Sequence, residues 1–460
     1  MQVSRMDNLI EIWPRDLKAK LRVLRVSNCA KLSSILFPSN LIECMQNLEE
    51  LIVEECESVK VAFDFGALNA DEDHGAARAL PSLDNLRLYG LPNLMHVWAN
   101  YSPGIQGFQN LRSLVVYGCS SLRILFSPFI AKLLVKLEQL YITNCDVMNA
   151  IIAWEQEVDD EGMRNTIIFP QLNIVKFRDL PNLTSITSQT CMFGGSFLKR
   201  LKLNNIPKLT GLCPASESNF DTTIHSLFNN KNTLTSIKEM KVSEMDNLIE
   251  IWPRDLKAKL RELRVNKCPK LTSILLPSNL KCMQNLEELI VDEWESVKVA
   301  FDFGALNADK DHGAARVLPS LDNLELYGLP NLTHVWANYS PGIQGFQNLR
   351  SLVVQGCDSL RILFSPFISK LLVKLEQLDI ENCDVMKAII ALEQEVDDEG
   401  MRNTIIFPRL TKVKLVDLPN LTSFCPQAYT IEGTFLKTVD IVNCSETMVL
   451  PSAFQLMQSL

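Results

Sequence analysis

Eight cysteines recur at one position of a repeated sequence pattern, and regularly spaced thiols could bind a metal ion or form redox pairs. The pattern is L-x-x-L-x-[VI]-x-x-C, and the chain contains no C-x-x-C pair of the kind that such sites use. A second copy of the segment replaces Cys56 by Trp294, which no ligand role would survive. We expect small, inward-pointing, reduced thiols that hydrogen-bond turn carbonyls, at Cys29, Cys56, Cys119, Cys145, Cys268, Cys357, Cys383 and Cys444.

Other residue types that carry chemistry are scattered rather than clustered. The five histidines stand apart from one another and from cysteines, and the acidic runs 155–162, 393–400 and 69–75 lack the alternating oxygen ligands of a calcium loop. No phosphate-loop, dinucleotide-binding, serine-hydrolase or zinc-protease motif occurs. We therefore expect a protein that is not an enzyme and has no cofactor or metal, with the acidic runs as solvated loops.

Composition narrows the classes of partner. The 460 residues are 47% hydrophobic and carry a net charge of −9, so the chain is globular and lacks the basic stripe that binds nucleic acid. The most apolar stretch after the N-terminus, LFSPFIAKLLVKL, is interrupted by Lys132 and Lys136, which argues against a membrane span. Thirteen cysteines without a secretory signal indicate reduced thiols. We expect a cytoplasmic protein that binds neither nucleic acid nor membrane.

A short repeat explains the cysteine spacing. Segments such as NLRSLVVYGCSSLRILF (110–126) alternate with a second form, such as SLDNLRLYGLPNLMHVW (82–98). In this second form Leu or Ile occupies the position of the Cys and is followed by Pro. Fifteen such units and a truncated first one fit the leucine-rich-repeat template, with a mean length of about 30 residues. The sequence predicts an α/β repeat: a leucine-rich-repeat solenoid of horseshoe or arc shape with a concave parallel sheet.

Each unit can supply one short strand, because apolar residues alternate with polar ones after the first Leu. One strand cannot bury its inner face alone, so the strands must stack into a parallel sheet. The convex return path is expected to be irregular or briefly helical. In SPFIAKLLVKL (127–137) we expect a helix with Ser127 as N-cap and Pro128 at its first position.

A longer repeat lies over the short one. Residues 1–186 align with 240–424, offset by 239 before a one-residue indel near Ile42 and by 238 after it. An open-ended solenoid can absorb such a copied block because each unit contacts only its neighbours. We expect repeats 1–236 as the first copy, with a junction loop at about 213–236, and 237–460 as the second, in one continuous solenoid.

The alternation of the two repeat forms, with spacers such as LFSPFIAKLLVKLEQL and NTIIFPQL, resembles the C-terminal repeat region of plant intracellular immune receptors. It is most similar to the coiled-coil, nucleotide-binding class of disease-resistance proteins. The resemblance implies a plant-defence protein that recognises a pathogen effector or a guarded host protein, with a nucleotide-binding receptor as a further partner. The nucleotide-binding domain of that class has no counterpart in the sequence.

Two other functions fit a repeat protein of this kind. One is a substrate-recruiting subunit of a ubiquitin ligase, which would need an adaptor-binding helical module before the repeats. The other is a steric enzyme inhibitor of the horseshoe type. A nucleotide-binding domain, a ligase adaptor module or neither upstream of the repeats would discriminate between these functions.

Differences between the two copies point to a binding face. Of 28 substitutions in residues 1–186, twelve fall two, four, six or seven residues after the first Leu, where side chains should point outward. Together these twelve substitutions change the net charge by −5 from the first copy to the second. The twelve positions are Gln2, Arg5, Val23, Ser27, Asn28, Glu54, Arg87, Tyr117, Tyr141, Thr143, Ile174 and Arg178.

Aromatic and arginine side chains at such positions are frequent anchors of protein interfaces. The candidate protein-binding residues of the concave face are Arg87, Tyr89, Tyr117, Tyr141 and Arg178 in the first copy, and Glu325, Tyr327, Asp379 and Glu381 in the second. Because their charges differ, we expect the first copy to prefer an apolar or acidic surface and the second a basic one.

Overall fold

The computed structural model describes most of both copies. The described residues are 1–12, 20–66, 78–101, 105–153, 167–187, 192–193, 197–212, 227, 236–252, 258–271, 280, 283–304, 315–339, 343–391, 404–425, 429–431 and 435–455. The acidic runs, most of the junction loop, and His74, His225 and His312 lie outside these residues.

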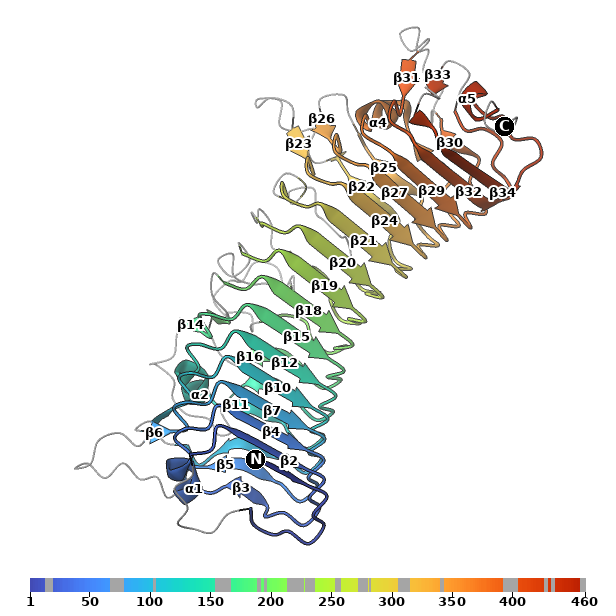
Figure 1. The fold of residues 1–460 in the computed structure, drawn as a ribbon. Helices are drawn as coiled ribbons and strands as arrows, with labels where there is room; N and C mark the ends of the chain where they lie inside the picture. The colour runs from blue at the N-terminus through green and yellow to red at the C-terminus, as the bar shows by residue number, and fades with distance from the viewer. Residues whose placement is uncertain are drawn as a thin grey trace. The chain divides into compact units, whose positions relative to one another are not determined.

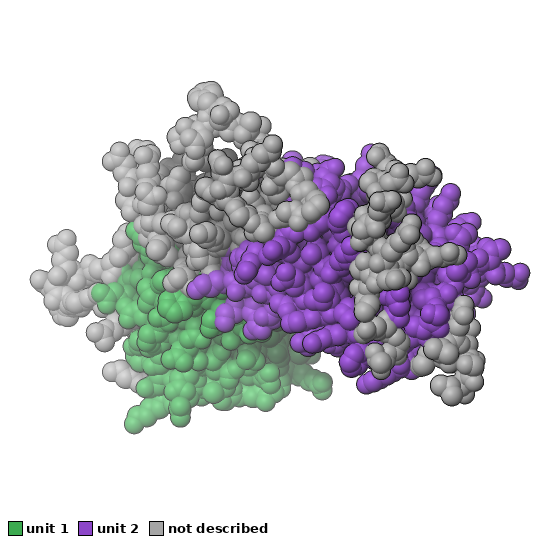
Figure 2. Space-filling model, turned by 90° about the horizontal axis from the view of Figure 1, so that it is seen from above, with its two compact units in different colours: residues 1–237, 244–248 green, residues 238–243, 249–460 purple. Residues whose placement is uncertain are grey.

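The chain forms two compact units, residues 1–237 with 244–248 and residues 238–243 with 249–460 (Figure 2). Each unit contributes eight strands to parallel pairing, which we call its main strands (Figure 1). In the first unit these are β1 (Gln2–Ser4), β2 (Val23–Ser27), β4 (Glu50–Glu54), β7 (Asn85–Tyr89), β10 (Ser113–Tyr117), β12 (Gln139–Thr143), β15 (Ile174–Arg178) and β18 (Arg200–Asn204). In the second they are β19 (Glu239–Ser243), β20 (Glu262–Asn266), β21 (Glu288–Asp292), β24 (Asn323–Tyr327), β27 (Ser351–Gln355), β29 (Gln377–Glu381), β32 (Lys412–Leu418) and β34 (Thr438–Cys444).

The alternation of apolar and polar residues builds these strands as predicted. In β10, Leu114 and Val116 are completely buried, whereas Ser113 and Tyr117 face outward. Leu114 pairs with Leu86 on one side and Leu140 on the other, so matching positions of consecutive repeats lie side by side. Each unit is therefore a leucine-rich-repeat solenoid whose concave wall is the parallel sheet, and the sixteen main strands correspond to the fifteen complete repeats and the truncated one.

Short strands and helices form the return path of each coil. The strands pair in small parallel sheets, which in the first unit are β3 (Ile35–Phe37) with β5 (Val61–Asp64) and β8 (His96–Ala99), β11 (Ile124–Phe126) with β13 (Ala150–Ile152) and β16 (Ser185–Thr187), β6 (Arg78–Ala79) with β9 (Gln106–Gly107), and β14 (Ile167–Ile168) with β17 (Met192–Phe193). In the second unit they are β22 (Val299–Asp302) with β25 (His334–Ala337), β23 (Ala315–Val317) with β26 (Ile343–Gly345), β28 (Ile362–Phe364) with β30 (Ala388–Ile390), and β31 (Thr404–Ile406) with β33 (Tyr429–Ile431).

The helices are one turn or slightly longer: α1 (Ser39–Cys44), α2 (Pro128–Leu133), α4 (Pro366–Leu371) and α5 (Ser452–Gln455). The predicted cap of α2 is confirmed, because the Ser127 hydroxyl accepts a hydrogen bond from the backbone N–H of Ile130 at 3.4 Å. In the part of the chain that the structure describes, no helix is both long enough and apolar enough to span a bilayer.

Stacked aromatic rings line the core behind the main strands. In the first unit Phe63 stacks on Phe37 and on Trp98, with ring centroids 5.4 and 5.3 Å apart. In the second unit Phe301 stacks on Trp336 at 5.2 Å. These rings repeat the one-coil spacing of the sheet, so they add a second column of contacts between successive coils.

The second repeat form has its own tie between coils. In its Pro-Asn-Leu sequence the Asn side chain donates a hydrogen bond to a backbone carbonyl of the preceding coil. The pairs are Asn93 to Glu57, Asn182 to Asp146, Asn331 to Glu295 and Asn420 to Asp384, at 2.6 to 2.8 Å. This bond satisfies a carbonyl that the return path would otherwise leave unpaired.

The cysteine ladder is confirmed at seven of its eight positions. Those seven thiols are buried, and each Sγ donates to the carbonyl of the residue two before it, for example Cys56 to Glu54 at 3.3 Å. Cys444 makes the same bond but is only half buried, because its strand β34 is the last in the main-strand order. Trp294, in the ladder position of the second copy, is completely buried and its indole N–H donates to Ser296 at 2.6 Å.

One prediction about the wall was wrong. The seventh residue after the first Leu does not continue the outward face but turns in the left-handed region, with φ of 55° at Asn28 and 54° at both Asn144 and Arg5 of the truncated unit. Its N–H donates to the last strand carbonyl of the next coil, as Asn28 does to Glu54 at 2.9 Å. Arg5 and Asn28 therefore lie in the turn and not on the concave wall.

Gly118 tests this turn, because its φ is +66° and an added Cβ would meet nothing closer than 3.5 Å. We expect Gly118→Ala to lower the free energy of unfolding, measured by urea denaturation, by about 1 kcal/mol through backbone strain alone. Gly118→Asn should cost less, since Asn tolerates this conformation and Asn144 occupies the next turn. Equal stability of wild type and Gly118→Ala would contradict the account of the turn.

Candidate functional site

The first unit presents its predicted tyrosines on neighbouring main strands. Tyr89 and Tyr117 are paired in register, and their ring centroids lie 6.2 Å apart. Tyr117 has 44% of its surface exposed, although it is a large apolar side chain in the middle of a sheet. The two rings form a continuous aromatic surface that faces solvent, as expected from their spacing.

Tyr141 lies one strand further on, at the centre of β12 rather than at its end. It pairs with Val115 on one side and Lys176 on the other. The Lys176 ammonium lies 4.8 Å from the centroid of the Tyr141 ring, which is a cation–π contact. The Tyr141 hydroxyl also bonds to Gln139 at 3.2 Å, so the ring is held on both of its sides.

The two predicted arginines of the first unit are weakly tied. Arg87 lies 3.9 Å from Glu50, and Arg178 lies 3.1 Å from Asp179 in the following turn. The Arg178 side chain is 66% exposed, so this ion pair restrains it without taking its charge out of solvent. Both guanidinium groups remain on the same wall as the tyrosines.

The second unit replaces this arrangement by carboxylates. The Glu325 carboxylate accepts from Asn323 at 2.8 Å and from the Tyr327 hydroxyl at 3.2 Å. Lys414, the counterpart of Lys176, forms ion pairs with both Asp379 and Glu381. The same lysine position therefore meets an aromatic ring in one unit and two carboxylates in the other.

Burial, with neighbouring acids, raises the pKa of two side chains on this face. Burial, reinforced by the neighbouring Glu381, raises the pKa of Asp379 to about 6, although Lys414 acts in the opposite direction. Burial and the negative Glu325 raise the pKa of Tyr327 to about 12. The face of the second unit thus holds more negative charge than its own cations neutralise.

Counting the outward main-strand positions makes the contrast general. The first unit has six cations, Arg25, Arg87, Lys176, Arg178, Arg200 and Lys202, against two anions, Glu50 and Glu54. The second has four cations, Lys241, Arg264, Lys412 and Lys414, against eight anions, Glu239, Glu262, Glu288, Asp292, Glu325, Asp379, Glu381 and Asp440. The two faces are opposite in net charge.

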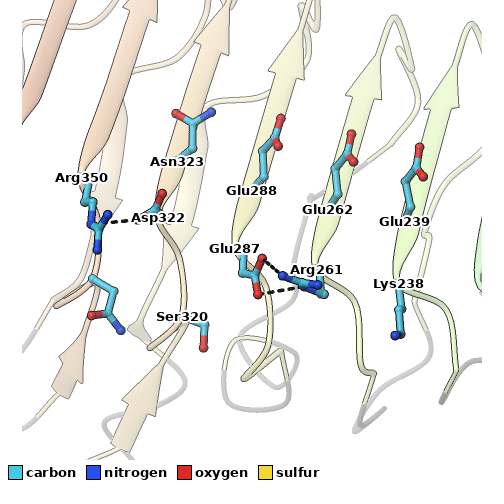
Figure 3. Close-up of a pocket in the computed structure, with 11 residues that line it drawn as sticks. Lys238, Glu239, Arg261, Glu262, Glu287, Glu288, Ser320, Asp322, Asn323 and Arg350 are labelled. Atoms are coloured by element: carbon cyan, nitrogen blue, oxygen red, sulfur yellow. Dashed lines mark hydrogen bonds and ion pairs between the residues drawn. The ribbon is translucent and has the colours of Figure 1, made fainter.

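Beside each face, a hollow not predicted from sequence lies at the N-terminal edge of the strands. In the second unit it measures about 600 Å³, and Figure 3 shows Glu239, Glu262 and Glu288 in a row across three neighbouring strands. Arg261 and Glu287, which also line it, form an ion pair at 2.7 Å. The first unit has a matching hollow of about 490 Å³, lined by Val23, Glu49, Glu50, Ser82, Asp84, Asn85, Asn110 and Arg112.

The residues just before the strands form a rim of ion pairs that is identical in both copies. Arg22 pairs with Glu49 at 2.8 Å, and Arg112 with Asp84 at 3.4 Å. Their counterparts Arg261 and Arg350 pair in the same way in the second unit. These exposed pairs are the same in both copies and therefore distinguish neither.

The site lacks the clusters that metal chemistry needs. Among the residues that the structure describes, no group of three or more His, Cys, Asp or Glu side chains could hold a metal ion. The candidate residues are instead large, exposed and spread along the sheet. Such a surface is suited to contact with another macromolecule.

Comparison with known proteins gives one family and several solved folds. The family model described as plant disease resistance protein RPS2-like, leucine-rich repeats, matches residues 1–146, 236–384 and 368–456. No curated protein matches the chain. Similar solved structures include a leucine-rich-repeat protein of Leptospira interrogans, with 17% identity, a TM-score of 0.39, and coverage of 92% of this chain and 90% of that one.

Two others are more distant in sequence. The functional domain of InlJ from Listeria monocytogenes is 13% identical, with a TM-score of 0.32 and coverage of 87% and 68% of the two chains. The Drosophila Toll–Spätzle complex has a chain that is 12% identical, with a TM-score of 0.39 and coverage of 96% and 53%.

The raised pKa of Asp379 makes a stability prediction. Because the folded state binds this proton more tightly than the unfolded chain, its contribution to stability is complete below about pH 4 and is lost as pH rises through about 6. Asp379→Asn should therefore be more favourable at pH 7.5 than at pH 4. We expect the change that it makes in the free energy of unfolding to be about 1–2 kcal/mol more stabilising at pH 7.5.

Urea denaturation at the two pH values measures this difference. The matched control is Tyr141→Asn, at the same position of the first unit, whose effect should not depend on pH in this range. An equal effect of Asp379→Asn at both pH values would show that the carboxyl is not shifted.

Proposed function

The chain belongs to the leucine-rich repeats of the RPS2-like plant disease resistance proteins, and from that premise we propose that it is a cytoplasmic, non-enzymatic defence protein. It recognises a pathogen effector or a guarded host protein through the concave face of its first unit. Leucine-rich-repeat proteins generally bind protein ligands, which agrees with a surface of exposed tyrosine and arginine side chains. A nucleotide-binding receptor is the partner through which recognition would be signalled.

This proposal rests on the positions at which the two copies differ in sequence. Ten of the twenty outward positions on β1 to β15 have changed between copies, against one of the thirteen inward positions, Phe177 to Leu415. Inward residues are held by packing, so their retention is expected. Eight of the ten changed side chains are half-buried or exposed, where a partner would touch them, whereas Ser27 and Ile174 are buried.

Neutral substitution of exposed residues does not account for this pattern. The rim residues Arg22, Glu49, Asp84 and Arg112 have side chains 40 to 72% exposed, yet all are identical in the second copy. Exposed pairs like these contribute little to stability. Exposure alone therefore does not produce change, which supports diversification of the concave face for binding.

Tyr117→Gln with Tyr141→Asp tests this function, because both replacements are the residues of the second copy and fit the same backbone. If the tyrosines are anchors, each change should cost about 2 kcal/mol or more in affinity for the partner. The measurement is quantitative recovery of bound proteins from leaf extract, followed by calorimetry with the purified partner.

The control is Met95→Thr, also a second-copy residue, on the return path, where Met95 is 52% exposed. It should leave binding unchanged. A partner that binds the double variant as tightly as the parent would place the site elsewhere.

A further inference from the structure

The outward positions of the last two main strands of the first unit carry positive charge and no acid. Their six outward positions hold Lys176, Arg178, Arg200 and Lys202, and no acid. Lys176 and Arg200 are exposed and have no ion-pair partner among the described residues. In the described part of the chain, Arg178 is paired with Asp179 alone, and that pair is exposed. The positive charge at this end of the face therefore favours binding of an anionic group.

The positive end continues directly into the tyrosines. Lys202 pairs in register with Lys176, Lys176 with Tyr141, and Arg178 with Thr143 beside Tyr117. We call Tyr89, Tyr117, Tyr141, Lys176, Arg178 and Lys202 the tyrosine–cation strip. It crosses five adjacent strands, which at about 4.8 Å per spacing gives a length of about 19 Å.

We propose that the tyrosine–cation strip binds an extended acidic segment of a partner protein, about six residues long. An extended chain advances about 3.3 Å per residue, so six residues match the length of the strip. Apolar or aromatic side chains of the segment lie on Tyr89 and Tyr117, and its carboxylates lie on Lys176, Arg178 and Lys202. This inference rests on the proposed function and specifies the chemistry of its ligand.

The charge at the far end of the strip favours a peptide over a nucleic acid. Glu54 pairs in register with Tyr89 on the next strand and lies 3.6 Å from Arg25, and Glu50 at the start of that strand lies 3.9 Å from Arg87, so the charges beyond Tyr89 cancel. A polyanion that continued past the tyrosines would find no net positive charge there. A segment that is acidic at one end and apolar at the other fits both ends of the strip.

The second unit provides an internal negative control. The positions that match the strip hold Tyr327, Gln355, Asp379, Lys414, Val416 and Asp440. Lys414 is the one cation retained, and it is already paired with Asp379 and Glu381. The same backbone therefore cannot attract an acidic segment in the second unit.

The test measures binding of a fluorescein-labelled octapeptide, Trp-Leu-Ser-Glu-Asp-Glu-Glu-Gly, to the full chain by fluorescence anisotropy at low ionic strength. Lys202→Asp introduces the residue of the second unit and should weaken binding at least tenfold. Arg5→Glu makes the same change in charge in the first turn, outside the strip, and should have an effect of threefold or less. A peptide with Lys and Arg in place of its acids should not compete.

Three results would overturn the inference. One is equal binding of the octapeptide by Lys202→Asp and Arg5→Glu, which would show that binding depends only on the net charge of the protein. Another is tighter binding of a twelve-nucleotide single-stranded RNA than of the octapeptide, with loss in Lys202→Asp, which would assign the strip to nucleic acid.

The third is no binding of the octapeptide at all. If the plant partner were still lost in the tyrosine double variant, the proposed function would stand and only the acidic segment would be wrong. If the partner were also unaffected by that variant, both would fail.

Discussion

Every feature of this chain depends on parallel, in-register pairing of one short strand per coil. A five-residue strand cannot bury Leu and Val side chains unless an equivalent strand lies on each side, so matching residues stack into columns. The left-handed turn after the strand and the Cys or Leu that follows continue the same register into the return path. Copying eight repeats together preserves all these contacts, which is why the chain tolerates so large a duplication.

The same constraint separates the two faces of each strand. Leu114 and its inward neighbours are fixed by packing, whereas Tyr117 is 44% exposed and lies beside Tyr89 on the same wall. Changing an outward residue alters the charge and shape of the wall at little cost to folding. The retained lysine shows this: Lys176 lies over a tyrosine ring, whereas Lys414, on an equivalent strand, forms ion pairs with two carboxylates. One scaffold thus presents two chemically opposite surfaces.

Much of the fold could be predicted from the sequence because repeat patterns are local. The strands, the Ser127 cap and the side-by-side tyrosines follow from spacing alone. The turn at Asn28 and Arg5 was misplaced because the first residue after a strand can point outward or turn back, and only φ decides between these two conformations. Asn at this position was an available signal, since it tolerates the left-handed region.

Parts of the candidate site were not predictable from a comparison of copies. Lys176 is identical in both copies, so a search for differences between them could not identify it. Its positive charge at an outward position was a signal that could have identified it. The shifted pKa of Asp379 depends on burial and on the nearby Glu381, which sequence spacing does not measure. The hollows at the strand edges depend on how exposed rim side chains are arranged in space, and no motif marks them.

The central claim is that outward side chains alone decide what each unit binds, on a backbone common to both. It is tested most directly by moving the strip into the second unit. The graft combines Gln355→Tyr, Asp379→Tyr, Val416→Arg and Asp440→Lys in a chain whose own strip carries Tyr141→Asp and Lys202→Asp. The measured quantity is the dissociation constant of the acidic octapeptide, with circular dichroism confirming the fold. Recovery to within about threefold of the parent value is the result this account predicts, and a folded graft that does not bind the peptide would contradict it.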